Sequence, residues 1–385
     1  MRRDFEPSPK WEPGEEDYAF VKVTGEGVHE IPVGPVHAGI IEPGHFRFQV
    51  VGEKVLRLEE RLGYVHKGIE KKFETLGLVE AHRLAGRVSG DSTVAYAWAY
   101  AQAVEALAAV AVPLRALWLR ALCLERERIA NHLGDLGYLG NDGGFAFGLS
   151  QFSRLKENVL RLNRELFGHR MLMDNVIPGG VACDVDDEGA AAMRKQCIAL
   201  RREIRVLRDI YDEHAGLQDR FRTCGQISNE LAVKLGLAGI AARASGVAQD
   251  LRCDFPVPPY DALSVNKVTH ADGDVAARVA VRFDETLESL RISDAILEAL
   301  PEGEIAAPIA GVNPFGLALG CVEGWRGPVL IALESGPGNT VRRCHPHDPS
   351  WQNWPVLEHA VIGNIVPDFP LINKSFNLSY SGHDL

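Results

Sequence analysis

The segment with the clearest chemical character is Ser89-Gly90-Asp91-Ser92, which follows Arg87-Val88 and precedes an alanine-rich stretch that predicts a helix over 93–112. An aspartate or serine just before a helix can accept hydrogen bonds from its first unpaired backbone N–H groups. Asp91 or Ser92 is therefore well placed to cap this helix. Capping accounts for the segment without giving it a chemical role.

A second polar segment lies upstream, in a loop over 34–45 that is rich in glycine and proline and carries Glu42 and His45. Tight loops of this composition often bring polar side chains to a site. Carboxylates and histidines that are partly removed from water can have pKa values near neutrality, which suits proton transfer. We find no nucleophile–base pair for covalent chemistry and no strand-to-helix context for a phosphate or dinucleotide loop.

A predicted helix over 113–136 changes from an apolar to a charged face in its second half, at Glu125, Arg128 and His132. Burial of Glu125 alone would cost several kcal/mol, on the order of the penalty for an unpaired charge, so a partner such as Arg128 is expected. A buried structural ion pair is favoured over a direct chemical role.

The elements that must position these residues are mainly helical. Alternating apolar residues around Gly52 predict a hairpin over 45–58, and two short helices are expected around Gly77. Further long helices are predicted over 150–167, 186–219 and 274–300, and strands over 327–333 and 339–343. The fold class is therefore α+β, mainly α: a bundle of long helices with small β-sheets from the N- and C-terminal parts. We expect an extended lead-in over 1–30 and one domain over 31–385, which is β-rich over 31–62, helical over 64–300 and mixed α/β over 325–385.

Composition excludes several classes of protein. The 385 residues carry a formal net charge of −11, which argues against a nucleic-acid partner or an anionic membrane surface. The seven cysteines are scattered without a Cys-x-x-Cys pair, so neither a disulfide framework nor an iron–sulfur site is indicated. No apolar stretch follows the N-terminal arginines, and the most apolar segment, 94–114, is interrupted by polar residues and a proline. We expect neither a secretory signal nor a membrane span.

Several short motifs occur together in a characteristic order. They are Gly34-Pro35-Val36-His37, Glu42-Pro43-Gly44-His45-Phe46-Arg47, His66-Lys67-Gly68-Ile69-Glu70, Arg87-Val88, Glu125-Arg126-Glu127-Arg128-Ile129-Ala130-Asn131-His132, Asn353-Trp354-Pro355 and the C-terminal segment. In this combination the chain resembles the large subunits of group 4 (formate hydrogenlyase-like) nickel–iron hydrogenases and the quinone-facing large subunit of respiratory complex I. The resemblance runs from about residue 30 to the end.

The resemblance implies that a nickel–iron centre is absent. In the hydrogenases four cysteines hold the metals, and their positions are occupied here by Ser89, Ser92, Ser379 and Gly382. Soft thiolates suit nickel and iron, whereas protonated hydroxyls are weak ligands. The family's arginine near the iron falls within 334–338, where no arginine is present. The chain also ends without a tail beyond the motif, as expected if no nickel-insertion processing occurs.

The quinone-binding pair of complex I is not matched cleanly. Gly90 falls at the position of the tyrosine, and either His45 or His37 could correspond to the histidine. The resemblance brings a ring of polar side chains to one cavity: Glu42, His45, Arg47, Glu70, Arg87, Ser89, Asp91, Ser92, Ser379 and His383. Among these, the candidates for proton transfer are Glu42, His45, Arg87, Asp91 and His383. The alternative is a buried polar network that remained when the metals were lost.

The resemblance predicts a subunit of a membrane-associated oxidoreductase complex that couples electron transfer to proton or ion movement. The chain would carry no cofactor of its own, an iron–sulfur cluster would reside in a partner, and quinone is possible. Expected partners are a small iron–sulfur subunit, other peripheral-arm subunits and antiporter-like membrane subunits, which would hold the chain on the cytoplasmic face of the cell membrane. A catalytically silent scaffold subunit is the alternative, and an active nickel–iron hydrogenase is the least favoured interpretation.

Overall fold

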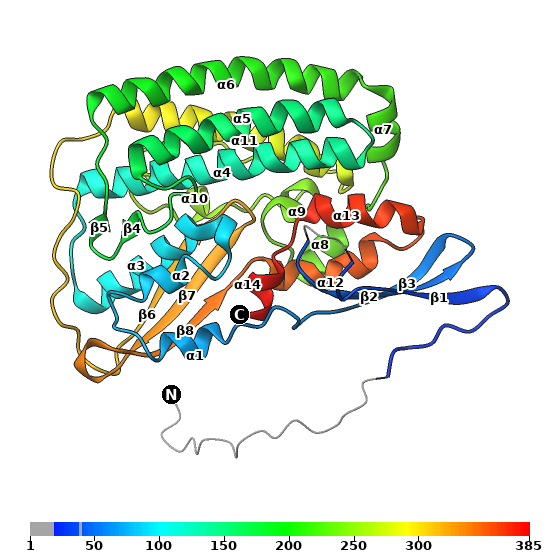
Figure 1. Cartoon of the computed structure of the whole chain (residues 1–385), viewed down its shortest axis with the longest axis horizontal. Coiled ribbons are helices and arrows are strands. Elements are labelled where there is room, and N and C mark those ends of the chain that lie inside the picture. The colour runs from blue at the N-terminus through cyan, green and yellow to red at the C-terminus, as the bar shows by residue number, and fades with distance from the viewer. Residues whose placement is uncertain (1–18, 38–40) are drawn as a thin grey trace.

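Long helices form the body of the molecule in the computed structural model, which describes residues 19–37 and 41–385. They are α3 (Thr93–Ala108), α4 (Leu114–Asp142), α5 (Ala146–Phe167), α6 (Asp187–Glu213) and α11 (Val275–Glu298). In Figure 1, α4, α5, α6 and α11 run side by side along the long axis of the molecule. The helices predicted from the apolar periodicity are confirmed, and α3 ends earlier than expected because Ala109 adopts a left-handed conformation.

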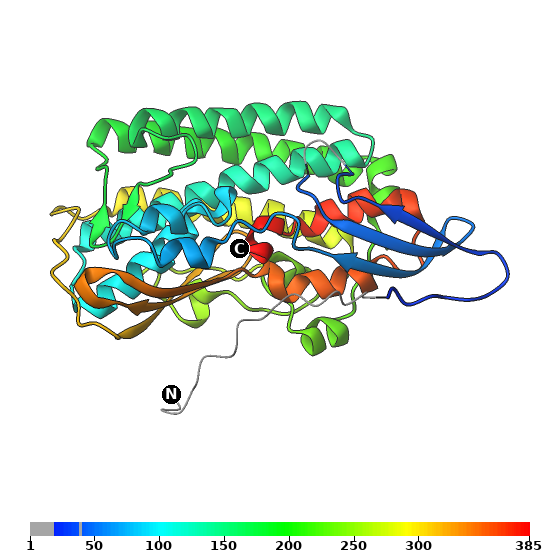
Figure 2. The same cartoon turned by 60° about the horizontal axis from the view of Figure 1, so that its bottom comes forward.

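Two three-stranded antiparallel sheets lie near opposite ends of this bundle (Figures 1 and 2). The N-terminal sheet has the order β1 (Val28–Val33), β2 (His45–Val51) and β3 (Lys54–Arg61), and the C-terminal sheet has the order β6 (Leu317–Glu323), β7 (Pro328–Ser335) and β8 (Val341–His347). A short hairpin, β4 (Val176–Ile177) and β5 (Gly180–Val181), connects α5 to α6. The hairpin around Gly52 and the predicted strands β7 and β8 are confirmed, whereas β1 and β6 were not predicted.

The alanine content of α3 has a packing reason. Strand β6 lies directly on α3, and a Cβ atom added to Gly320 would stand 1.8 Å from the carbonyl oxygen of Ala99. Only small residues permit helix and strand to approach this closely. Strand β6 is hard to recognise from sequence, because its residues from Leu317 to Val322 do not alternate between apolar and polar positions.

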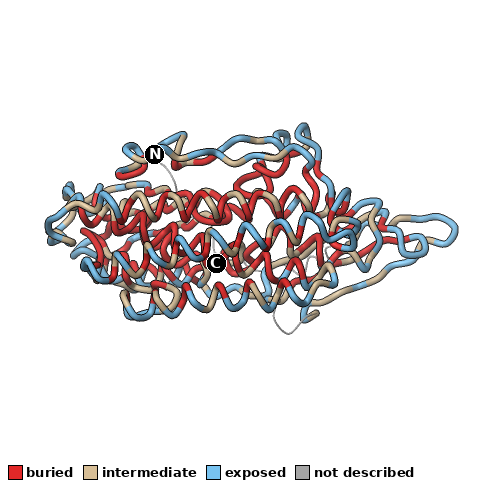
Figure 3. Tube along the Cα trace, turned by 90° about the horizontal axis from the view of Figure 1, so that it is seen from above, coloured by how far each residue is buried: buried red, intermediate tan, exposed pale blue. Residues whose placement is uncertain are grey.

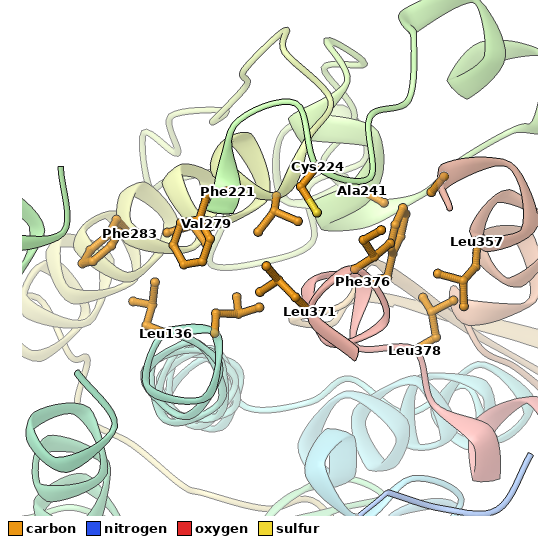
Figure 4. Close-up of a cluster of buried hydrophobic side chains, with 14 of the residues drawn as sticks. Leu136, Phe221, Cys224, Ala241, Val279, Phe283, Leu357, Leu371, Phe376 and Leu378 are labelled. Carbon is orange, nitrogen blue, oxygen red and sulfur yellow. The ribbon is translucent and has the colours of Figure 1, made fainter. Parts of the chain in front are cut away.

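Shorter helices complete the described structure: α1 (Ile69–Phe73), α2 (His82–Ala85), α7 (Ala215–Phe221), α8 (Asn229–Leu235), α9 (Gly239–Ala244), α10 (Leu251–Asp254), α12 (Ser350–Ala360), α13 (Phe369–Phe376), α14 (Tyr380–Asp384) and the 3-10 turns η1 (Gly90–Ser92), η2 (Pro337–Asn339) and η3 (Val366–Asp368). Apolar side chains from α4, α11 and α13 meet in the core, including Leu136, Phe283 and Leu371 (Figure 4). Viewed from above, buried residues occupy the inner faces of the helices and exposed residues the rim (Figure 3). The core thereby fixes α13 and the segment after it against α4.

Buried charges also cross the bundle. Glu125 accepts hydrogen bonds from Arg252 at 3.1 Å and from the Tyr260 hydroxyl at 2.7 Å, whereas the expected partner Arg128 is 3.8 Å away. A buried ion pair at Glu125 is confirmed, with a different main partner. Among the helices of residues 19–37 and 41–385, we find no segment with the length and apolar character needed to cross a bilayer.

Candidate functional site

Two segments that lie far apart in the sequence, one around Ser89 and one around Ser379, meet in the structure. The Ser89 and Ser379 hydroxyl oxygens are 2.9 Å apart although 290 residues separate them in sequence. Ser379 also accepts a hydrogen bond from the Gly382 backbone N–H at 2.9 Å, which caps α14. Both serines are buried. The segments 89–92 and 379–382 therefore lie against each other and form one continuous surface, here termed the serine wall.

Asp91 and Arg326 form a bidentate ion pair in this wall. The guanidinium donates to both carboxylate oxygens, at 2.7 and 2.6 Å, and also to the Ser92 hydroxyl at 3.3 Å. Burial alone would raise the pKa of Asp91, but the charge and hydrogen bonds of Arg326 lower it below its ordinary value. The Asp91 carboxylate is thereby held ionised. An arginine does lie beside these positions: Arg326 reaches them from outside the segment 334–338, in which the resemblance placed the family's arginine.

Neither the Asp91 nor the Ser92 side chain caps α3, so the prediction that one of them caps this helix is wrong. The N–H groups of Val94 and Ala95 donate instead to the Glu127 carboxylate of α4, at 2.7 and 3.3 Å. Asp91 is engaged by Arg326 and is therefore not available to the helix. A carboxyl group from a neighbouring helix thus accepts hydrogen bonds from the unpaired N–H groups at the start of α3.

A cavity of about 730 Å³ opens beside this wall. It is bounded by η1, by the second half of α4, by α5 and by the segment from α13 to α14. The polar and charged lining includes Glu42, Ser89, Asp91, Asn131, Asp135, Asn141, Asp142, Lys156, Arg326, Asn373, Lys374, Asn377, Ser379 and Ser381, and the apolar lining includes Ile41, Met171, Pro370 and Leu378. This volume and mixed lining are typical of small-molecule sites.

Of the five candidates for proton transfer, Glu42 and Asp91 line the cavity. Glu42 accepts a hydrogen bond from the Ser381 backbone N–H at 3.1 Å. The other three lie outside the lining: His45 faces the Gly34 carbonyl oxygen at 3.4 Å, Arg87 is paired with Asp174, and His383 contacts Asp384 at 3.0 Å.

The remaining members of the predicted ring divide in the same way. Ser89 and Ser379 line the cavity, whereas Ser92 lies behind its wall, against Arg326. Arg47 pairs with Glu30 across β1 and β2, and Glu70 contacts His345 at 2.6 Å. Strand pairing directs Arg47 away from the cavity, and α1 directs Glu70 toward β8. The expected single ring is therefore only a partial one.

The residues considered for a quinone head group, Gly90 and either His45 or His37, do not all lie at the cavity. Gly90 lines the cavity and carries no side chain to donate a hydrogen bond. His45 is buried with its Nε2 atom unpartnered, and His37 packs edge-on against Phe46. Residues 38–40 between them lie outside the described residues.

The four positions that the resemblance matches to metal-binding cysteines, Ser89, Ser92, Ser379 and Gly382, are a poor fit for nickel and iron. Three offer serine hydroxyls and the fourth offers no side chain where thiolates would be needed, and the hydroxyls already bond one another, Asp91 or Arg326. A Cβ atom added at Gly382 would lie 2.4 Å from the Asp348 carboxylate, so a cysteine does not fit there without a shift. Within the described residues, no group of three or more His, Cys, Asp or Glu side chains is arranged to hold a metal ion.

Several important lining residues were missed from sequence. Asp135 accepts from Arg282 at 2.9 Å and from Asn377 at 2.7 Å, and its pKa is lowered well below its ordinary value: burial would raise it, but Lys374 and Arg282 outweigh burial. It continues the charged face of Glu125, Arg128 and His132 by one more step of three, which is the signal that could have found it. Arg326, Lys156 and Lys374 carry no comparable pattern.

Comparison with known proteins finds relatives that match most of the chain. A family profile described as "Respiratory-chain NADH dehydrogenase, 49 Kd subunit" matches residues 142–315. Formate hydrogenlyase subunit 5 of Escherichia coli K12 is 33% identical over 99% of this chain, and the chain spans 67% of its length. The carbon monoxide-induced hydrogenase of Rhodospirillum rubrum is 30% identical, with 91% of this chain and 97% of the relative covered.

The likeness extends to a solved structure. A chain of the membrane-bound sulfane sulfur reductase, described as an archaeal respiratory membrane complex, superimposes with a TM-score of 0.87 at 25% identity, over 94% of this chain and 100% of the other. An NADH-quinone oxidoreductase component of Desulfotalea psychrophila is 29% identical over 90% of this chain and 94% of its own length. The chain therefore belongs to the family of the respiratory-chain NADH dehydrogenase 49 kDa subunit, together with these hydrogenase subunits.

Proposed function

We propose that this chain is a subunit of a membrane-associated oxidoreductase complex and couples electron transfer to proton or ion movement without a nickel–iron centre of its own. The family and the names of its relatives support the first part, since they include subunits of formate hydrogenlyase and NADH-quinone oxidoreductase. The observation that carries the second part is the hydrogen-bonded pair of Ser89 and Ser379, which stands where thiolates would be required.

The proposal assigns the redox centres to partners. The chain would dock on a small iron–sulfur subunit and other peripheral-arm subunits, and antiporter-like membrane subunits would hold it at the cytoplasmic face of the membrane. Quinone is a possible electron acceptor. Within the chain, Glu42 is the group best placed to exchange protons, because it is exposed at the cavity and lies beside the serine wall.

Metal analysis of the purified complex tests the absence of the centre. We expect iron and acid-labile sulfide from the partner subunit, and nickel at less than about a tenth of an equivalent per chain, because hydroxyls are weak ligands for it. One nickel per chain would overturn this part of the proposal.

A substitution in the assembled complex tests the coupling. Glu42→Gln should reduce the number of ions moved per electron at least about twofold while electron transfer continues, since the amide cannot carry a proton. Glu53→Gln, at an exposed carboxylate in the β2–β3 turn, is the matched control and should change neither quantity. Unchanged coupling in the Glu42 variant would favour the scaffold, an interpretation that the mutual hydrogen bonding of the serines also supports.

A further inference from the structure

Lys156 of α5 is an unpaired cation at the cavity. It lines the cavity, and within the described part of the chain its ammonium makes no hydrogen bond and no ion pair. The neighbouring cations are paired: Arg326 with Asp91, and Lys374 and Arg282 with Asp135. The two nearest carboxylates are therefore already neutralised by other side chains.

Gly134 allows Lys156 to reach this position. The side chain of Lys156 crosses α4 at Gly134, where an added Cβ atom would lie 2.8 Å from Nζ and 3.3 Å from Cδ of the lysine. Any side chain at 134 would displace the amine. The position of the amine therefore depends on the absence of a Cβ atom at Gly134. The same helix, α4, also contributes Asn131, Asp135 and Tyr138 to the lining of the cavity.

Next to the lysine, cations outnumber the carboxylates that pair with them. Lys156, Arg326 and Lys374 line the cavity and Arg282 lies behind the lining, and together they face two carboxylates, Asp91 and Asp135. Two further carboxylates line the cavity, Glu42, which accepts a backbone hydrogen bond, and Asp142, whose pKa is raised by burial, so the two signs balance across the cavity and the positive excess is local to Lys156.

The lysine itself is incompletely compensated. Burial lowers the pKa of Lys156, and the attraction of Asp135 and Asp91 does not offset it. An ammonium that is partly removed from water without a counter-ion costs free energy, which a bound anion would recover.

We propose that the cavity binds a small organic carboxylate, with the Lys156 ammonium as its counter-ion. The apolar lining residues Ile41, Met171 and Leu378 offer contact to the carbon part of such a ligand. The proposal deepens the proposed function, on which it rests, because it names the ligand class of the same cavity. Binding is measured on the full chain without partner subunits, so its failure is distinguishable from failure of the coupling assay.

Thermal unfolding of the full chain with acetate as the probe tests the proposal. A ligand that binds only the folded state raises the melting temperature in a saturable manner. We expect this for the wild type with acetate and not with acetamide, which has the same shape without the charge. Lys156→Gln should raise the half-saturating acetate concentration at least about tenfold, whereas Lys195→Gln, at an exposed lysine of α6, should leave it unchanged.

Gly134→Ala separates the position of the charge from its presence. Alanine is favoured over glycine inside a helix, and only the flexible end of Lys156 must move, so the variant should fold. It keeps the lysine but should bind acetate severalfold more weakly. An acetate response in Lys156→Gln equal to that of the wild type, or equal responses of the wild type to acetate and acetamide, would overturn the proposal.

Chemical labelling gives a readout that does not need a variant. The wild type is treated with a limiting amount of an amine-acylating reagent, and labelling is followed by mass spectrometry of the peptides. Acetate should slow acylation of Lys156 and leave Lys195 unaffected. Equal labelling of Lys156 with and without acetate would contradict the proposed contact.

Discussion

Asp91 shows how single residues define the cavity wall. Its carboxylate holds Arg326, and its backbone carbonyl oxygen accepts from Asn131 at 2.7 Å and from the Trp325 indole at 2.9 Å. The Arg326 guanidinium in turn donates to the carbonyl oxygen of Asn377 at 2.6 Å, and Asn377 lies two residues before Ser379. One ion pair therefore links the segment before α3 to the last segment of the chain.

Asp91→Asn should destabilise the protein by about 2 kcal/mol, because the nearly buried Arg326 would lose its counter-charge. This is less than the 3–5 kcal/mol typical of a fully buried pair, since the Asp91 side chain is 36% exposed and water can reach the guanidinium. Chemical denaturation of the two proteins measures the difference.

Asp174→Asn is the matched control, because it breaks the bidentate but more exposed pair with Arg87. Its cost should stay below about 1 kcal/mol. Equal losses of stability in the two variants would show that the Asp91–Arg326 pair stabilises the protein no more than an exposed ion pair does.

At the scale of elements, α3 depends on α4 for its first turn. Glu127 reaches from α4 to the N–H groups of Val94 and Ala95, and it is buried. Burial is the main cause that raises the pKa of Glu127 to about 8, although the two backbone donors oppose it. The Glu127 carboxyl group, which lies between two packed helices, therefore begins to lose its proton just above neutral pH.

The raised pKa predicts how stability depends on pH. The unfolded carboxyl loses its proton near pH 4.5 and the folded one near pH 8, so the folded state binds more protons in between. Stability from this group is then fully present below pH 4.5 and falls as pH rises toward 8, by about 1.4 kcal/mol per pH unit at most.

Glu127→Gln should remove this dependence, because the amide oxygen can still accept from the helix and cannot ionise. Denaturation curves at pH 5 and pH 8 should lie closer together for the variant than for the wild type. If the wild-type stability did not fall more steeply than that of the variant over this range, the raised pKa would be wrong.

At the scale of the whole molecule, a buried charge network ties the bundle to the C-terminal sheet. Glu285 of α11 accepts from Arg128 of α4 at 2.5 Å, from Arg243 of α9 at 2.6 Å and from His132 at 3.1 Å. Arg243 also donates to Glu323 of β6 at 2.9 Å. Glu285 therefore compensates positive charge that two helices, α4 and α9, bring into the core, and Glu323 of β6 shares Arg243 with it.

Glu285→Gln should cost about 3–5 kcal/mol at pH 7, since it leaves buried guanidinium groups without their counter-charge. Burial would raise the pKa of Glu285, but Arg243 and Arg128 outweigh burial and hold it well below its ordinary value. Its contribution is therefore present above pH 4.5 and is lost as pH falls below that value.

Denaturation of the variant and the wild type at pH 7 and at pH 3.5 measures both effects, and the difference between the two proteins should shrink at the lower pH. Glu203→Gln, in an exposed pair with Arg154, is the control and should cost less than about 1 kcal/mol. A Glu285 variant as stable as this control would show that the network does not hold the core together.

Periodicity identified most of the helices because burial of one face imposes spacing on the chain, as in α4 and α11. Periodicity failed for β6, which packs closely on α3 at Gly320 and does not alternate between apolar and polar positions from Leu317 to Val322. The cap prediction failed at Asp91 because the local sequence indicates only the nearest acceptor for the helix N–H groups. The acceptor in the structure, Glu127, and the partner of Asp91, Arg326, come from remote segments.

By itself the sequence determined the mainly helical class and the hairpin around Gly52, since these depend on residue type and spacing. That Ser89, Ser92 and Ser379 stand where the hydrogenases carry cysteines stays a prediction from the resemblance. Only the tertiary structure decided which polar side chains share the cavity. Arg326, Lys374 and Lys156 reach it from three separate elements, and His45, Arg87 and His383 are directed elsewhere by their own contacts. Long-range ion pairing selects partners by position in space, and a single sequence carries no local pattern for that selection.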